Sequence, residues 1–405
     1  MNTKIRSFTF CFTACFAGIS FLGQVAQGAV ITVTTEQDLQ SVINSASSND
    51  QIKLLPGTYS GEYSLTDKNL TISQSGGTPT LTKFSLSGGR VTLIGLQIGQ
   101  VLSSDSNNQA GNHLIHQCEI GNIESNTSSF TLQYSDVGSL IVNKKATVTA
   151  CLFDGAGGGG VGITVRGSLG DAIIQNSIIR KYGAVIGSAI SNECLGIWVT
   201  NGAKGIIRNN IVHGCKDLNY NGNEVNAGIG ICINDNASGV VSGNIVWDCF
   251  IADKSSTNLP NDGSSALVKV TAQSLVLNNF LWPVVDSSIS RTQLGLDVQS
   301  GWRIHNLIIG SNAVGTVSTN PKFVNWQDGD YRLASDSPAI NAGPSDPQYN
   351  DRDGSRNDIG MFGGHNFIPD GRTTNKPIVL GLDIAPIAVP TGGTVTIEST
   401  GATVK

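Results

Sequence analysis

Five charged and aromatic residues recur three positions after a repeated site in the chain, and together they could bind a sugar chain. They are Asp154, Arg180, His213, Trp247 and Trp282. Because side chains alternate along a strand and parallel strands lie about 4.8 Å apart, we expect an outward column whose step is close to one sugar unit. Aromatic faces stack on sugar rings, and polar groups orient them. The spacing therefore predicts a saccharide track, with Asp154, Trp247 and Trp282 as substrate-binding residues.

Basic residues on and beside this column are candidates for lyase chemistry. Removing a proton next to a uronate carboxylate needs a base and a positive charge, or a metal, to neutralise the carboxylate. The candidates are Lys181, His213 and Arg180.

Hydrolysis needs instead two carboxylates about 5 to 9.5 Å apart, which Asp217 and Asp248 on neighbouring coils could provide. No catalytic motif of a known family matches either chemistry. The alternative for Lys181, Asp217 and Asp248 is therefore that they are solvated surface charges in loops without a chemical role.

A structural role is the alternative for the aromatic members of the column. Trp and Arg on a solenoid surface often pack under a neighbouring loop, and four long loops are available here. These loops follow the same strand of their coil and span residues 183–194, 216–228, 250–265 and 282–295. Insertions gathered on one face of a repeat array often build its binding face, so the loops support both interpretations.

The column belongs to a sequence repeat that predicts a solenoid. Residues 196–215 return almost intact as residues 230–249, with β-branched runs, Asn and Gly at corners, and no helical periodicity. A fixed period of this kind is typical of stacked coils. Stacked polar side chains can satisfy one another at a corner, so we interpret the repeated site as a structural ladder. It comprises Cys118, Cys151, Ser177, Asn210, Asn244, Asn279 and Asn306.

We therefore predict an all-β fold, a right-handed parallel β-helix over residues 30–365, with a capping helix over residues 34–46. Thr34 and Gln37 have the spacing of a capping box. A helix of this sort can close the apolar end of a stack. One face of the predicted helix is apolar and comprises Leu39, Val42, Ile43 and Ala46.

The first 29 residues predict a secretory signal. Lys4 and Arg6 precede an apolar run over residues 8–22, and small residues follow. The run is too short for a membrane span. A lipoprotein site at Cys15 is a weaker alternative because it leaves a very short apolar region. We expect a secreted protein, extracellular, at the cell surface or in the periplasm.

Composition narrows the partners. The net charge of −5 and the lack of any Lys/Arg run argue against nucleic acid, because phosphate binding needs a basic face. An extracellular polysaccharide is the expected partner, and a monomer the expected state. Six cysteines follow the signal, and an even number of cysteines in an exported protein suggests disulfide bonds. Shared columns favour packed thiols instead for Cys118 with Cys151 and for Cys215 with Cys249.

Two motifs add a family resemblance. A short helix followed by Pro56-Gly-Thr-Tyr59 resembles exported β-helix proteins of the pectate-lyase-like superfamily. The C-terminal motifs resemble choice-of-anchor Q proteins, although Asn320 and Asn341 replace two acids of that signature. The resemblance implies the β-helix fold but no single activity, because the superfamily contains lyases, hydrolases, epimerases and non-catalytic surface proteins.

Whether the protein binds a metal cofactor is an open question, raised by three neighbouring carboxylates, those of Asp351, Asp353 and Asp358. Clustered carboxylates suit calcium. Glycine follows directly after Asp353, however, unlike a calcium-loop pattern, so we favour a closing turn in which the carboxylates cap backbone amides. Residues 366–405 predict a linker and a short β tail.

Three functions therefore remain open. They are an enzyme acting on a polysaccharide, a non-catalytic polysaccharide-binding surface protein, and an adhesive or structural solenoid.

Overall fold

The computed structural model describes residues 28–104, 111–158, 160–184, 194–220, 228–253, 266–271, 273–282, 294–298, 303–304, 307–308, 320–351, 353–364, 377–385 and 396–403. Nearly all of the predicted signal, Asn306 of the ladder and most of each of the four long loops lie outside these residues.

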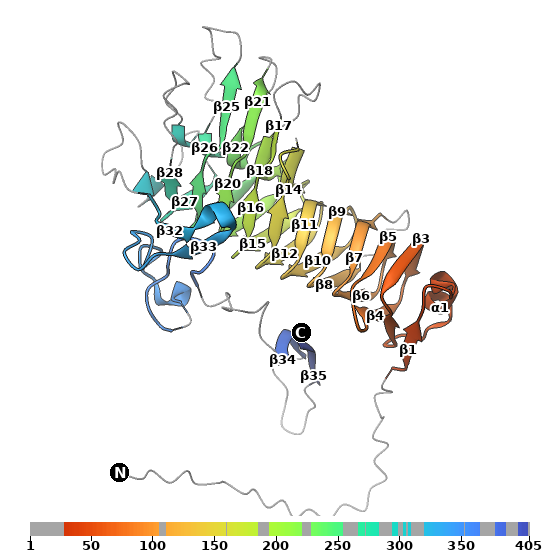
Figure 1. Ribbon diagram of the computed structural model, residues 1–405. Helices are drawn as coiled ribbons and strands as arrows, with labels where there is room; N and C mark the ends of the chain where they lie inside the picture. The colour runs from red at the N-terminus through yellow and green to blue at the C-terminus, as the bar shows by residue number, and fades with distance from the viewer. Residues whose placement is uncertain are drawn as a thin grey trace, which may run out of the picture.

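Two long parallel sheets form the described stack of coils (Figure 1). In a strand such as β10 every second residue is buried, because side chains alternate between core and surface. All the strand pairs of both sheets are parallel, which confirms the predicted β-helix. The first sheet contains β1 (Val30–Val33), β2 (Gln51–Leu54), β4 (Asn69–Gln74), β6 (Arg90–Ile94), β8 (Asn112–His116), β10 (Ser129–Gln133), β12 (Lys145–Thr149), β15 (Asp171–Gln175), β19 (Lys204–Arg208), β23 (Ser238–Ser242), β27 (Leu275–Leu277) and β30 (Arg303–Ile304).

The second sheet begins with long strands and then divides into two rows. The long strands are β3 (Gly57–Thr66), β5 (Pro79–Ser87), β7 (Gln97–Ser103), β9 (Glu119–Ser125) and β11 (Asp136–Val142). One row contains β13 (Leu152–Asp154), β16 (Ile178–Arg180), β20 (Ile211–His213), β24 (Ile245–Trp247), β28 (Phe280–Trp282) and β31 (Leu307–Ile308). The other contains β14 (Gly160–Arg166), β18 (Cys194–Thr200), β22 (Ile229–Ile233), β26 (Ala266–Val270) and β29 (Leu294–Val298).

The division comes from insertions placed directly after the short strands. Each of the four long loops begins after β16, β20, β24 or β28, as predicted. Three of the insertions start with strands that pair in parallel and rise from the stack in Figure 1. These strands are β17 (Gly183–Ala184), β21 (Lys216–Tyr220) and β25 (Phe250–Asp253).

The capping helix is shorter than predicted. Helix α1 spans Leu39–Ser45, and the side chain of its N-cap, Asp38, accepts a hydrogen bond from the Gln40 amide. The Gln37 side chain does accept from the Thr34 amide, but that bond closes a turn before the helix. The predicted apolar face is correct: Leu39, Ile43 and Ala46 are buried, and Val42 packs against them. Figure 1 shows α1 at one end of the stack.

The polar ladder is present, with one member that the spacing missed. Asn210 and Asn244 each accept from the backbone amide of the preceding rung and donate to carbonyl groups. Ser135 lies between Cys118 and Cys151 and accepts from the Cys118 amide, so the 33-residue step spans two coils. Ser135 was not predicted as a member of the ladder because neither its neighbouring residues nor its spacing match those of the later rungs. All six cysteines after the signal are buried, and none of them forms a disulfide.

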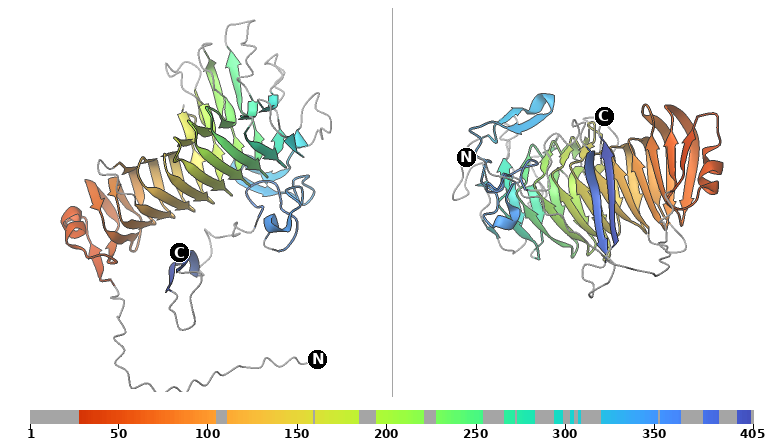
Figure 2. Two further views of the ribbon diagram at one scale, coloured as in Figure 1. Left: turned by 180° about the vertical axis from the view of Figure 1, so that it is seen from behind. Right: turned by 90° about the horizontal axis from the view of Figure 1, so that it is seen from below.

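Residues 320–364 pack back on the last described coils, as Figure 2 shows from behind and below. This segment, here called the C-terminal cover, contains β32 (Phe323–Asn325), η1 (Trp326–Asp328), β33 (Asp330–Leu333) and η2 (Pro347–Tyr349). Strands β34 (Pro377–Ala385) and β35 (Thr396–Thr403) pair antiparallel. No helix among the described residues is long and apolar enough to cross a membrane.

Candidate functional site

The strand register brings the predicted column together. Asp154 pairs with Arg180, Arg180 with His213, His213 with Trp247, and Trp247 with Trp282. These residues end the successive short strands β13, β16, β20, β24 and β28. The prediction that they share one column is therefore confirmed.

The prediction that this column is an open track is wrong at His213 and Trp247. His213 is 4% exposed and Trp247 is 2% exposed. The two rings stack with centroids 4.2 Å apart at an interplanar angle of 8°. Phe323, Trp326 and Tyr331 of the C-terminal cover surround them. Trp247 therefore anchors a segment of the chain and cannot present a face to a sugar.

The cover lies here because the neighbouring column of the same strands is apolar. Ile211, Ile245 and Phe280 belong to one buried cluster with Trp247, and Ile178 and Trp282 pack against it. Burying such a surface stabilises the fold by roughly 25 cal/mol per Å². The structural alternative thus holds for Trp247, although the cover comes from the C-terminal segment.

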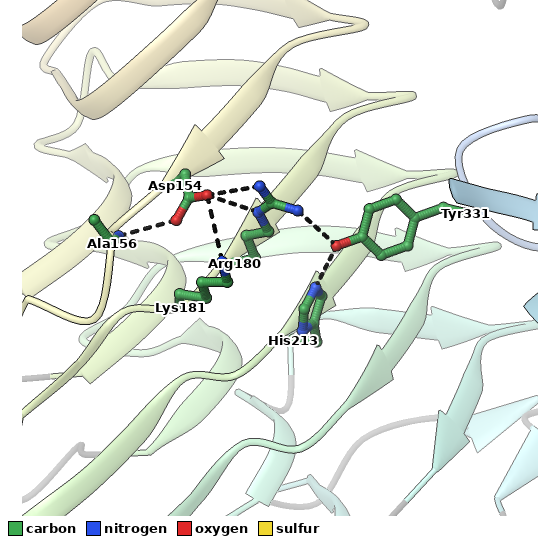
Figure 3. Close-up of polar contacts among 6 residues, drawn as sticks. All are labelled: Asp154, Ala156, Arg180, Lys181, His213 and Tyr331. Carbon is green, nitrogen blue, oxygen red and sulfur yellow. Dashed lines mark hydrogen bonds and ion pairs between the residues drawn. The ribbon is translucent and has the colours of Figure 1, made fainter. Parts of the chain in front are cut away.

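Arg180 is held by one partner from the column and one from the cover (Figure 3). Its guanidinium lies 2.7 Å from the carboxylate of Asp154. It also donates to the hydroxyl of Tyr331 at 3.0 Å, and that hydroxyl lies 2.9 Å from Nε2 of His213. Tyr331 therefore links two residues of the column to the cover.

His213 is a poor candidate for the base. Burial, and to a smaller extent the charges of Arg180, Lys181 and Lys216, lower its pKa to about 3. The ring is neutral at pH 7, and Tyr331 can donate to it. A general base works best with a pKa near the operating pH, so His213 contributes packing and hydrogen bonding instead.

In both carboxylates of the site, burial raises the pKa, whereas the hydrogen bonds and charges of neighbouring groups lower it. Burial would raise the pKa of Asp154, but hydrogen bonds from Ala156 and Arg180 and the charge of Lys181 outweigh it and lower the pKa. Burial prevails at Asp248 and raises its pKa, although Lys216 donates to this carboxylate. Both carboxylates are thus occupied by partners.

A pocket of about 630 Å³ opens beside this cluster, where the insertions leave the stack. The Lys181 side chain is 53% exposed and its Nζ lies 3.9 Å from Asp154. Lys216 and Asp248 form an ion pair of 2.7 Å on the next coils. The lining residues are Asp154, Ala156, Gly157, Lys181, Gly183, His213, Gly214, Lys216, Asp248 and Trp326.

Two lining residues have a backbone conformation that glycine would adopt more easily. Lys181 has φ of 60° and Asp248 has φ of 55°, and the corresponding residue on the coil between them is Gly214, with φ of 70°. A left-handed conformation costs a residue with a side chain about 1 kcal/mol or more. Strain of this kind often gathers at functional sites.

Several site residues lay beyond the reach of the sequence pattern. Lys216 was missed because it begins an insertion, although it follows the repeated Cys215. Tyr331 and Trp326 were missed because they lie in the C-terminal motifs, which we read only as a family signature. Asp217 belongs to β21, where its backbone pairs with Ala184 and Ile251, and its side chain lies outside the described residues. The carboxylate pair proposed for hydrolysis is therefore untested.

A second cavity, of about 650 Å³, adjoins the pocket and shares Asp154 with it. Along the outward column that holds Asp154, the earlier coils have Gly138, Gly121 and Gly99. The beginning of the column is thus an open groove, whereas its end is covered. The lining residues are Thr58, Thr80, Leu81, Thr82, Gln97, Ile98, Gly99, Glu119, Ile120, Gly121, Asp136, Val137, Gly138, Leu152 and Asp154.

The three aspartates considered for calcium bind backbone and side-chain groups of the cover itself. Asp351 accepts from the amides of Asp358 and Gly364. Asp358 accepts from the Asn341 amide, and Asp353 from Ser355. The closing turn that we favoured is confirmed by these bonds.

The coils and their sheets define a parallel β-helix. The structure is similar to the crystal structure of pectate lyase Pel9A, with a TM-score of 0.57 and 14% sequence identity over 84% of this chain and 98% of that one. It also matches a mutant of the PL6 family alginate lyase AlyGC, with a TM-score of 0.39 and 14% identity over 81% of this chain and 58% of that one.

No family model matches the chain, and no curated protein matches its sequence. The similarity to Pel9A shows the fold alone at this level of identity. The choice-of-anchor resemblance stays a prediction.

Proposed function

We propose that this protein is exported and binds a uronate-containing polysaccharide, with one uronate unit in the pocket of Lys181, Lys216 and Asp248. Export is supported by the charge, apolar run and small residues of the first 29 positions. A polysaccharide is supported by the fold shared with Pel9A, a pectate lyase.

The observation that carries the proposal is the exposed ammonium group of Lys181 at the pocket. The pocket lining holds Lys181 and Lys216 with the carboxylates of Asp154 and Asp248, Arg180 lies next to it, and His213 is neutral. Arg180 and Lys216 each have a close carboxylate partner. Lys181 is the exposed cation, so its ammonium group is available to a ligand carboxylate.

β-Elimination at the same pocket is a second candidate function, favoured by the position of Lys181. In that reaction a base takes the proton next to the uronate carboxylate, a C=C bond forms, and the bond to the neighbouring sugar oxygen breaks. The Lys181 amine would take the proton, while Lys216 would stabilise the charge that develops on the carboxylate. Non-catalytic binding requires only the charge and shape of the pocket.

A panel of acidic and neutral polysaccharides separates these functions. We expect the protein to bind polymers that contain uronate and to ignore neutral ones. Products that absorb as unsaturated uronates would establish elimination. New reducing ends without that absorbance would point to hydrolysis, and binding with no product would identify a binding protein. A protein that binds none of the acidic polymers would contradict the proposal.

A further inference from the structure

The groove that adjoins the pocket has a chemistry of its own. It follows β5, β7, β9 and β11, and reaches the pocket at Asp154. A side chain cannot fill its floor: a Cβ added at Gly99 would lie 2.7 Å from the carbonyl oxygen of Thr82, and those at Gly121 and Gly138 would meet the backbone of the preceding coil. The stacking of the coils thus keeps the groove open.

One side of the groove is an outward column of polar residues in register. Thr80 pairs with Gln97, Gln97 with Glu119, and Glu119 with Asp136. Thr80 donates to the Gln97 side chain at 2.8 Å. Leu152 continues the column on the next coil, and Ile178, on the coil after it, packs against the cover. The residues that line the groove therefore offer hydroxyls, an amide and carboxylates, and none of them is basic.

The groove lining is acidic, whereas the pocket lining holds two lysines and two aspartates. Asp154, at the junction, is matched by Arg180. Glu119 and Asp136 lie side by side further along the groove, without a Lys or Arg in its lining. Carboxylates accept hydrogen bonds from sugar hydroxyls, but they repel another carboxylate.

We infer that the groove and the pocket bind one continuous glycan in which a uronate unit is followed by uncharged sugars. This inference rests on the proposed function of the pocket and specifies its substrate class. The uronate meets Lys181, and the neighbouring sugars lie over Gly138 and Gly121 with their hydroxyls toward Asp136 and Glu119. A chain of uronates alone would place a carboxylate against Glu119 or Asp136.

The test compares two oligosaccharides of equal length by isothermal titration calorimetry. One is an oligogalacturonate, and the other carries a single glucuronate unit followed by neutral sugars. We expect the chain with a single uronate to bind about tenfold more tightly at low salt, because only the homopolymer meets like charge in the groove. The double variant Glu119→Gln with Asp136→Asn should remove this preference by strengthening binding of the oligogalacturonate.

Glu124→Gln is the matched control, because Glu124 lies on the same strand, β9, outside the groove lining. It should leave the ratio of the two affinities unchanged. Glu119→Gln alone, at an exposed position, should shift the ratio in the same direction if the double variant fails to fold.

Equal affinities in the wild type, or a ratio that neither variant changes, would overturn the inference and leave the proposed function standing. Failure of both oligosaccharides to bind would overturn the two together.

Discussion

At the scale of single residues, Tyr331 determines which residues of the column can contact a substrate. Its hydroxyl lies between Arg180 and His213 and fixes both, so neither is free to meet a substrate. Two residues that the sequence placed in the chemistry are thereby assigned to the junction between the β-helix and its cover. Lys181 differs from both because its side chain is 53% exposed, although its ammonium group lies 3.9 Å from Asp154 in the same cluster.

Trp247 gives the residue-scale prediction that separates a sugar platform from a packing anchor. Trp247→Ala should lower the free energy of unfolding by about 3 to 5 kcal/mol, because it empties a buried site between His213 and the cover. Trp282→Ala should cost less, since Trp282 is only half-buried. Urea unfolding measures both changes. A Trp247→Ala protein of normal stability with weakened glycan binding would restore the platform interpretation.

At the scale of elements, the end of helix α1 depends on one lysine. Lys68 donates through Nζ to the carbonyl oxygens of Ile43, Asn44 and Ala46, at 2.8, 2.7 and 2.8 Å. The last carbonyl groups of a helix have no hydrogen-bond partner within the helix. A positive charge at that end also interacts favourably with the negative end of the helix dipole. A residue of the stack thus holds the helix that closes the end of the stack.

Lys68→Met should therefore destabilise the N-terminal coils by about 1 to 2 kcal/mol. Methionine keeps most of the length of the side chain and removes the donor. Hydrogen exchange should show faster opening of α1 and β3, with the later coils unchanged. Lys145→Met, at an exposed position of β12, is the control. Equal protection of α1 in both variants would show that Lys68 does not hold the helix.

The elements also show where sequence reasoning succeeds and where it stops. Repeats such as 196–215 and 230–249 predict coils because each coil buries the same faces, so the pattern is local and periodic. The cover was missed because its contact with the column joins residues far apart in the chain, such as His213 and Tyr331. A Trp at an outward position looks the same in sequence whether it meets a sugar or a distant segment. Lys181 was found because it follows the column directly.

At the scale of the whole molecule, buried histidines should make the fold sensitive to acid. Burial lowers the pKa of His113 and His116 to about 4 and that of His213 to about 3, below the ordinary value of 6.5. Below pH 6.5 these histidines bind protons in the unfolded chain, whereas in the folded protein they stay neutral. Stability is therefore lost as the pH falls from 6.5 toward 4, by about 1.4 kcal/mol per pH unit for each histidine.

Asp351 works in the opposite direction over part of this range. Burial raises its pKa to about 6, so its contribution to stability improves as the pH falls from about 6 toward the ordinary value near 4. The net effect of the four groups is still a loss. Unfolding free energies at pH 7 and pH 5 measure it, and His116→Leu should reduce the difference, since His116 is fully buried. An unchanged difference in that variant would contradict this account.

Charge and the C-terminal cover divide the outward face of the described coils into regions. Coils up to β11 present glycines and carboxylates in an open groove, the coils from β16 onward carry the cover, and the pocket of Lys181 and Lys216 lies at the boundary. The central claim is that this boundary binds a uronate through Lys181.

The affinity of Lys181→Gly for a uronate-containing polysaccharide tests that claim most directly. Glycine removes the ammonium group and also relieves the left-handed backbone at φ of 60°. We expect a protein at least as stable as the wild type whose binding falls about tenfold or more. Lys204→Met, at an exposed lysine on β19, should bind normally. Unchanged binding by a stable Lys181→Gly protein would show that Lys181 does not contact the uronate.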